Sequence, residues 1–295
     1  MKNYRIAITT GDKLGIGKEI VQKALSIIKP DRKDVLIVGE KIDANYDHYL
    51  IEEENNGVFC YKSLEFVCEL AKKGIIKGIV TAPVSKLELN RAGYNFLGQT
   101  EVIEGLFEKN EKKAQMLFIA GDLKVLLLTR HCALKDIDLT IEDVVFRIEI
   151  LNSFLYEKYR IKNPKIALCA LNPHAGEGGI LGKEEIEILN PAAQLLRQKG
   201  INITNPLSAD GLFSKVGKLY LNKEKQDYDA IVSCYHDQGL CPLKALCFDS
   251  AVNTTIGLDV IRTSPSSGTA YDIANKGIAD PRSMVEAINL ALSLS

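Results

Sequence analysis

The sequence predicts an α/β protein built on a mostly parallel sheet. Short apolar runs rich in Val, Ile and Leu alternate with longer amphipathic stretches along the 295 residues. This alternation is typical of a sheet covered by helices on both faces. The runs are continuous and do not alternate with polar residues, as expected of strands buried on both sides. A chain of this length can form one large domain or two smaller domains that share a sheet.

Six apolar runs are predicted to be strands. They are residues 5–9, 34–39, 78–82, 124–129, 165–171 and 229–235. Between them lie five stretches whose apolar residues recur at helical spacing, and these are predicted to be helices. They are residues 18–28, 64–74, 100–109, 142–159 and 184–200. Several of them end at glycine or near proline, which are the usual stop signals of helices.

The C-terminal part of the chain departs from this alternation. Residues 245–270 are predicted to form strands and turns without a helix. The tail is predicted to be a closing helix, with Asp280 as its N-cap and Pro281 as its first residue. No repeat or flexible linker separates the segments, so two domains would have to share chain crossings.

Composition excludes several classes of function. Lys and Arg total 37 and Asp and Glu total 38, so no overall basic field exists to hold nucleic acid or an anionic membrane. An anionic substrate must therefore be bound by a local cluster of cations. The seven cysteines are scattered without a CxxC pair, and no signal segment or membrane-spanning stretch is evident. These features predict a cytoplasmic chain with reduced cysteines.

Three of the four histidines come directly after a predicted strand. They are His131, His174 and His236. A single histidine at a strand end is usually an ordinary surface group, but parallel strands bring their carboxyl ends to one edge of the sheet. Three imidazoles with an open position form a common catalytic site for a divalent metal. We therefore predict one metal site, with Asp210 and Asp237 as candidates to complete it or to orient a ring.

Other polar segments allow two interpretations each. The glycine-rich loop at residues 10–20 suits phosphate at a helix N-terminus, but it matches neither GxGxxG nor the P-loop pattern. A tight turn that needs glycine is the favoured interpretation there, and residues 174–185 raise the same question. Further along, Lys244, Asn253 and Arg262 suit either a pocket for carboxylate or phosphate, or a sheet edge with scattered polar groups.

Several motifs together resemble the 4-hydroxythreonine-4-phosphate dehydrogenase family, the pyridoxal phosphate biosynthesis enzymes and their close paralogues. In chain order they are TGDKLGIGKEI, VTAPVSK, GQTE, LNPHAGEGG, YHDQG and GTAYDIANKGIADP. The resemblance covers nearly the whole chain. It implies a fold like that of isocitrate and isopropylmalate dehydrogenases, with two α/β lobes around a central cleft. The expected lobes are residues 1–130 plus 245–295, and residues 131–244, the second forming a homodimer with shared active sites.

The resemblance also implies roles for individual residues. It assigns the metal to His131, His174 and His236, the three histidines selected above. It assigns proton transfer to Asp210 and Lys244. The substrate contacts that it implies are Gln99, Thr100, Lys244, Asn253 and Arg262. The implied cofactors are NAD or NADP and a divalent ion, with zinc expected first and magnesium or cobalt as alternatives.

The implied reaction is oxidation, with decarboxylation, of the small substrate 4-phosphohydroxy-L-threonine. One alternative is a catabolic paralogue that oxidises a four-carbon sugar acid 4-phosphate of the threonate or erythronate type. Less favoured are a metal-dependent hydrolase, which NAD binding would exclude, and a metabolite-binding protein, which would not need an open metal.

Some positions depart from the family pattern. Gln99 and Ser267 stand where histidines are common, and Lys13 stands in place of a proline. We expect Lys13 and Arg130 to be the cations that replace a charge lost at Gln99.

Overall fold

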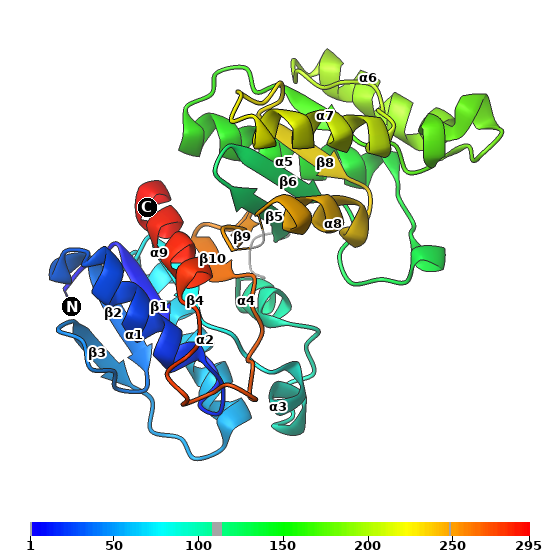
Figure 1. The fold of residues 1–295 in the computed structure, drawn as a ribbon. Helices are drawn as coiled ribbons and strands as arrows, with labels where there is room; N and C mark the ends of the chain where they lie inside the picture. The colour runs from blue at the N-terminus through cyan, green and yellow to red at the C-terminus, as the bar shows by residue number, and fades with distance from the viewer. Residues whose placement is uncertain (1, 108–113, 248) are drawn as a thin grey trace. The chain divides into compact units, whose positions relative to one another are not determined.

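The computed structural model describes residues 2–107, 114–247 and 249–295, and it divides the chain into two compact units (Figure 1). The first unit comprises Met1–Ala114 and Asp249–Ser295, and the second comprises Gln115–Phe248. Residues 115–130 and 245–247 were expected in the first lobe, but they belong to the second unit. The two strands within residues 115–130 form a hairpin, one strand of which pairs with a later strand of the second unit, and residues 245–247 end a helix of that unit.

The first unit is built on strands in the order β3-β2-β1-β4-β10-β9. Their bounds are β1 (Ile6–Thr9), β2 (Val35–Gly39), β3 (Asp47–Leu50), β4 (Gly78–Thr81), β9 (Val252–Ile256) and β10 (Ile261–Pro265). All neighbours in this order are parallel except β9, which runs antiparallel to β10. Every residue of β1, β2, β4 and β10 is buried, which explains the continuous apolar runs of the first three, whereas β10 buries the polar residues Arg262, Thr263 and Ser264.

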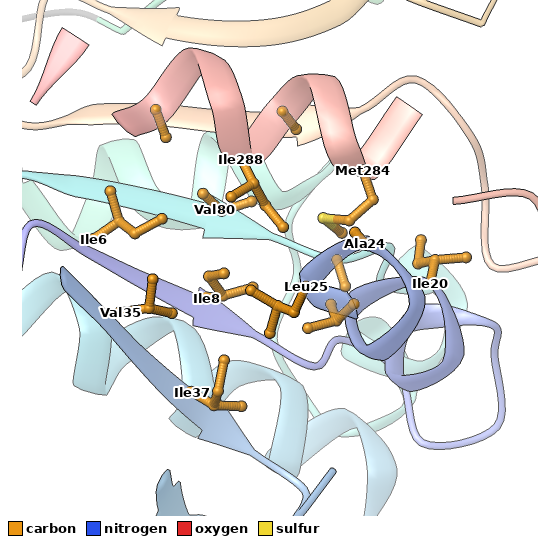
Figure 2. Close-up of a cluster of buried hydrophobic side chains, with 14 of the residues drawn as sticks. Ile6, Ile8, Ile20, Ala24, Leu25, Val35, Ile37, Val80, Met284 and Ile288 are labelled. Atoms are coloured by element: carbon orange, nitrogen blue, oxygen red, sulfur yellow. The ribbon is translucent and has the colours of Figure 1, made fainter. Parts of the chain in front are cut away.

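Helices cover both faces of this sheet. On one face, α1 (Gly17–Ile28) and α9 (Arg282–Leu294) form a core with alternate residues of β1 and β2, and Figure 2 shows Ile8, Leu25 and Ile288 meeting there. The other face packs against α2 (Asn56–Lys72), α3 (Lys86–Arg91) and α4 (Gln99–Phe107). A 3₁₀ turn, Arg32–Asp34, precedes β2.

The second unit is built on strands in the order β5-β6-β8-β7. Their bounds are β5 (Gln115–Ala120), β6 (Leu123–Leu127), β7 (Ile166–Leu168) and β8 (Ala230–Ser233). β5 and β6 form the antiparallel hairpin, whereas β6, β8 and β7 are parallel neighbours. The carboxyl ends of these three strands, each followed by one of the predicted metal-binding histidines, therefore lie at one edge of the sheet.

The helices of the second unit are α5 (Ile141–Tyr159), α6 (Asn190–Gln198), α7 (Ala209–Leu221) and α8 (His236–Cys247). Shorter turns are Leu134–Asp136, Pro173–Gly179 and the π-helical turn Glu185–Leu189. α8 lies very close to the sheet, because a Cβ at Gly239 would come within 2.7 Å of Ser233 Oγ. This close approach packs the first turns of α8, which begins at His236, directly against β6 and β8.

The predicted elements are present, with changes at their ends. The first turn of α2 begins eight residues before the predicted 64–74 helix, and the predicted 184–200 helix is a π-helical turn followed by α6. The prediction for the tail was wrong by one residue. Pro281 is the N-cap of α9, and Asp280 Oδ1 accepts a hydrogen bond from the Arg282 N–H at 2.9 Å.

The cysteines are free thiols, as expected. Five of the seven are buried, and burial raises the pKa of Cys68 and of Cys169 to about 12. These thiols behave as small apolar groups and not as nucleophiles. Among the described residues, no helix is long and apolar enough to cross a membrane.

Candidate active site

Two of the predicted metal ligands, His131 and His236, lie together in the second unit. They follow the neighbouring parallel strands β6 and β8, and their ring centroids are 5.6 Å apart. Asp237 Oδ1 lies 2.7 Å from His236 Nδ1, so this nitrogen donates and Nε2 is left to bind a ligand. A carboxylate behind a histidine is a common support for a metal ligand. The imidazoles of His131 and His236 therefore fit a divalent metal as two of its ligands.

His174 does not join this pair in the described chain. It stands six residues beyond the end of β7, on a turn whose backbone is left-handed from His174 to Gly178. Within the described ranges, no three His, Cys, Asp or Glu side chains are close enough to hold one ion. The site of three histidines therefore stays a prediction. It requires either a movement of His174 or a ligand from a second copy of the chain.

Asp210, the predicted proton-transfer residue, lies near His174. It is exposed in the first turn of α7, and the Ser208 hydroxyl donates to it. This hydrogen bond, together with the Gly211 N–H and the nearby His174, lowers the pKa of Asp210 below its usual value. At neutral pH the group is therefore a carboxylate, which suits a proton acceptor and not a donor. Lys244 is half-buried on α8, about 12 Å along the helix axis from His236.

Arg262 is the most deeply buried charged group among the predicted site residues. It is 2% exposed on β10, and burial lowers its pKa to about 10, although the carboxylate of Glu101 opposes this shift. Its Nε and Nη2 donate to Thr81 Oγ1 at 3.0 and 2.6 Å, and its Nη1 donates to Thr100 Oγ1 at 3.4 Å. Within the described chain these hydroxyls are its hydrogen-bond partners. The Glu101 carboxylate offsets part of this buried charge, but no ion pair with Arg262 is found among the described residues, so the guanidinium still favours binding of an anion.

Two other predicted substrate contacts hold buried acceptor atoms. Gln99 begins α4, and its Nε2 donates to the Ala82 carbonyl at 3.2 Å, which identifies Oε1 as the other end of the amide. Asn253 lies on β9 opposite Ser264. Gln99 Oε1 and Asn253 Oδ1 are buried, and no hydrogen-bond partner for either is found among the described residues. Such acceptors are satisfied if a ligand donates to them.

The first glycine-rich loop is a tight turn, as the sequence favoured. Gly11 has a φ of +73°, and a Cβ there would come within 2.5 Å of the Pro83 carbonyl oxygen. The backbone N–H groups of residues 12–16 all donate to acceptors inside the first unit. They are therefore engaged and do not face a phosphate.

Lys13, expected to replace a charge lost at Gln99, has partners of its own in this structure. Its ammonium donates to the Glu53 carbonyl and lies 4.5 Å from the centre of the Phe59 ring. Its role in replacing a charge at Gln99 stays a prediction.

The sequence did not single out two further polar residues of the first unit. Thr81, at the end of β4, accepts two hydrogen bonds from Arg262. Asp12 is fully buried and accepts from the Tyr271 hydroxyl at 2.6 Å and from the Asn56 amide at 2.8 Å. The sequence feature that could have identified both residues is a polar residue shortly after an apolar run, the same feature that identified the histidines.

The model of the family described as pyridoxal phosphate biosynthetic protein PdxA matches residues 15–291. The chain belongs to the PdxA family. A relative from Sulfurihydrogenibium sp., named 4-hydroxythreonine-4-phosphate dehydrogenase, is 36% identical and is aligned over 98% of both chains. Another, from Oceanobacillus iheyensis, is 34% identical over 98% of this chain and 97% of its own, and its name suggests D-threonate 4-phosphate dehydrogenase.

Solved structures agree with PdxA membership and with the predicted fold class. The crystal structure of 4-hydroxythreonine-4-phosphate dehydrogenase from Klebsiella pneumoniae aligns with a TM-score of 0.83, at 31% identity and over 99% of both chains. Isocitrate dehydrogenase from Methylococcus capsulatus aligns with a TM-score of 0.56 over 98% of this chain and 85% of its own. At 14% identity the second likeness concerns the fold alone. The predicted isocitrate dehydrogenase-like α/β fold is confirmed.

Proposed function

We propose that this PdxA-family chain is an NAD-dependent and divalent-metal-dependent oxidoreductase of the cytoplasm. Its substrate is 4-phosphohydroxy-L-threonine, which it oxidises and decarboxylates in pyridoxal phosphate biosynthesis. The observation that carries the proposal is the buried Arg262, whose guanidinium meets only threonine hydroxyls within the described chain. A planar guanidinium binds two oxygens of a phosphate or carboxylate at once, and such bonds strengthen where water is excluded.

Three other residues of the first unit, Gln99, Thr100 and Asn253, complete the proposed substrate site. The free acceptors, Gln99 Oε1 and Asn253 Oδ1, take hydrogen bonds from a hydroxyl or an amino group. Thr100 stays beside Arg262 and adds a hydroxyl to the anion site. In the second unit, Asp210 accepts a proton as a carboxylate, and Lys244 is the candidate for returning one.

His131, His174 and His236 would hold the metal, which is zinc by the preference of imidazole ligands, with magnesium or cobalt as alternatives. When bound, the ion would lower the pKa of the substrate hydroxyl, and the nicotinamide would accept a hydride. Asp237 keeps Nε2 of His236 available by accepting from its other nitrogen. The homodimer expected of this family would bring ligands from two chains to one site.

A second candidate substrate is a four-carbon sugar acid 4-phosphate such as D-threonate 4-phosphate. The Oceanobacillus iheyensis relative carries a name of this kind, and Gln99 replaces the family's histidine in this chain. A neutral amide acceptor takes a hydrogen bond from a hydroxyl as well as from an amino group, so it tolerates the exchange of one for the other.

NADH formation across a panel of phosphorylated four-carbon acids tests the proposal. We expect 4-phosphohydroxy-L-threonine to give the highest kcat/KM, with activity lost after chelation and restored by Zn²⁺. A preference for D-threonate 4-phosphate would establish the second candidate. Phosphate release without NADH formation would instead reveal a hydrolase and overturn both.

A further inference from the structure

The turn that carries His174 has an unusual backbone. His174, Ala175 and Glu177 have φ angles of 50°, 54° and 45°, and Gly176 and Gly178 between and after them are also left-handed. Residues with a Cβ rarely adopt this region, and almost never several in succession. Such a turn persists only where its surroundings hold it in place.

One buried carboxylate contacts this turn at its entry. Glu185 is 2% exposed, and its Oε1 accepts hydrogen bonds from the Leu171 and Asn172 N–H groups, both at 2.8 Å. Its Oε2 accepts from Asn172 Nδ2 at 3.0 Å. These bonds fix the chain directly before Pro173 and His174.

The same carboxylate contacts the middle of the turn. A Cβ at Gly176 would come within 2.6 Å of Glu185 Oε2, so the backbone packs directly on the carboxyl group. A Cβ at Gly182 would likewise come within 2.3 Å of Asn172 Nδ2. His174 therefore lies between two points that are both held by Glu185, and the glycines allow this close approach.

We propose that Glu185, through its hydrogen bonds to residues 171–172 and its contact with the turn at Gly176, is the positioning residue that presents His174 for metal binding. The inference rests on the proposed function, because it takes His174 as a metal ligand. Glu185 lies in the π-helical turn Glu185–Leu189. Such turns often occur at functional sites.

The test measures Zn²⁺ affinity of the metal-free full-length protein by competition with a chromophoric chelator. Glu185→Gln keeps the size of the side chain but puts an N–H₂ group against either the backbone N–H groups or the Asn172 amide. We expect Zn²⁺ binding to weaken about 10- to 100-fold, as for other residues that orient a metal ligand. The urea midpoint of each metal-free variant is measured in parallel.

Glu184→Gln is the matched control. Glu184 accepts from the same Asn172 amide at 2.6 Å, but it does not bond the two backbone N–H groups, so Zn²⁺ affinity should stay unchanged. If Glu185→Gln does not fold, Glu185→Asp keeps the charge but draws the carboxylate back from both backbone N–H groups and from Gly176. A weaker Zn²⁺ affinity in that variant supports the proposal, and an unchanged affinity overturns it.

His174→Ala separates the two ways of failing. If His174→Ala weakens Zn²⁺ binding but Glu185→Gln lowers only the urea midpoint, Glu185 is merely structural and this inference is overturned. If His174→Ala binds Zn²⁺ like the wild type, the proposed set of metal ligands fails, and the positioning role fails with it.

Discussion

Arg262 combines a permanent charge with nearly complete burial, so its contribution to binding is open to a direct test. Replacing it with alanine removes charge-assisted hydrogen bonds worth about 1.5–3 kcal/mol. We expect KM for the phosphorylated substrate to rise about 10- to 100-fold. The value of kcat should change little, because the guanidinium holds the anion in both the ground and the transition state. Steady-state kinetics at pH 7 measure both constants.

Two further variants make this result specific. Arg262→Lys keeps the charge but loses the planar pair of donors, so its KM should lie between those of the wild type and Arg262→Ala. Asp210→Asn should show the opposite pattern, a lower kcat with little change in KM, because its carboxylate matters most while a proton moves. An Arg262→Ala enzyme with normal KM and reduced kcat would contradict the assigned role.

Gln99 tests whether charge at this position matters for phosphate. Gln99→His restores the residue common in the family, and a histidine gains a positive charge as the pH falls below about 6.5. We expect the ratio of the variant's KM to the wild-type KM to stay constant between pH 8 and pH 5.5, because Gln99 offers its ligand the acceptor Oε1, which suits a hydroxyl or amino group and not a phosphate. Dividing by the wild-type KM removes the pH dependence that both proteins share, which comes from the substrate phosphate and the other histidines.

A ratio that falls with the pH would mean instead that the side chain at position 99 contacts the phosphate. The hydrogen bond from Gln99 Nε2 to the Ala82 carbonyl argues against that outcome, since it leaves only an acceptor for the ligand. The variant therefore distinguishes contact with the anion from contact with a hydroxyl.

At the scale of elements, one charged residue connects the edge strand β3 to the N-terminal segment and to the turn before β2. Asp47 accepts from Lys2 Nζ at 2.8 Å, from the Tyr4 hydroxyl at 3.0 Å and from Arg32 Nη2 at 3.1 Å. These hydrogen bonds lower the pKa of Asp47 to about 2 from its usual 3.8. A carboxyl group whose pKa is lower in the folded than in the unfolded protein stabilises the folded state at pH values above its unfolded-state pKa. This contribution is lost as the pH falls through the folded-state pKa.

We expect Asp47→Asn to lower the urea midpoint at pH 7. The difference from the wild type should shrink as the pH falls from about 4 to about 2, because the wild-type carboxylate is protonated there. Urea titrations of both proteins at pH 7, 4 and 2 measure it. Asp31→Asn is a suitable control, since its ion pair with Lys33 is largely exposed. A difference that persists unchanged at pH 2 would exclude the charge as its source.

Elements with continuous apolar runs were predictable, whereas those shaped by other parts of the chain were not. β2 was found within one residue of its bounds because all five of its residues are buried. β3 was missed because the sequence DHYL is polar and half-exposed at an edge. α8 was missed because Pro242 and Gly239 interrupt its pattern, although Gly239 is what allows the helix to lie close to β6 and β8.

For the whole molecule, the sequence predicted the edge at which functional groups gather but not how they group. His131 and His236 follow neighbouring parallel strands, so the pairing of β6 with β8 explains their contact. The position of His174 depends on a left-handed turn that Glu185 holds from eleven residues further along the chain. No local pattern at residues 171–179 reveals that carboxylate.

The last prediction concerns the source of the third metal ligand. Within the described chain, His131 and His236 lie together while no third His, Cys, Asp or Glu completes a site. If a homodimer forms and His174 comes from the second copy, two differently disabled chains can complement each other. We expect His174→Ala and the double variant His131→Ala/His236→Ala each to be inactive alone. Mixed by joint refolding, they should recover about a quarter of wild-type activity, because half of the dimers are mixed and each mixed dimer has one intact site of two.

Sedimentation of the wild type tests whether the homodimer forms, since an active monomer of 32.6 kDa would rule out any shared site. No recovery on mixing, in a protein that sediments as a dimer, would place all three histidines in one chain and require His174 to move toward His131 and His236.

A mixture of His131→Ala with His236→Ala is the matched control. These two ligands come from one chain, so each site of a mixed dimer keeps one defect and activity should stay absent. Recovery in that control would mean that the observed pair is itself divided between two copies.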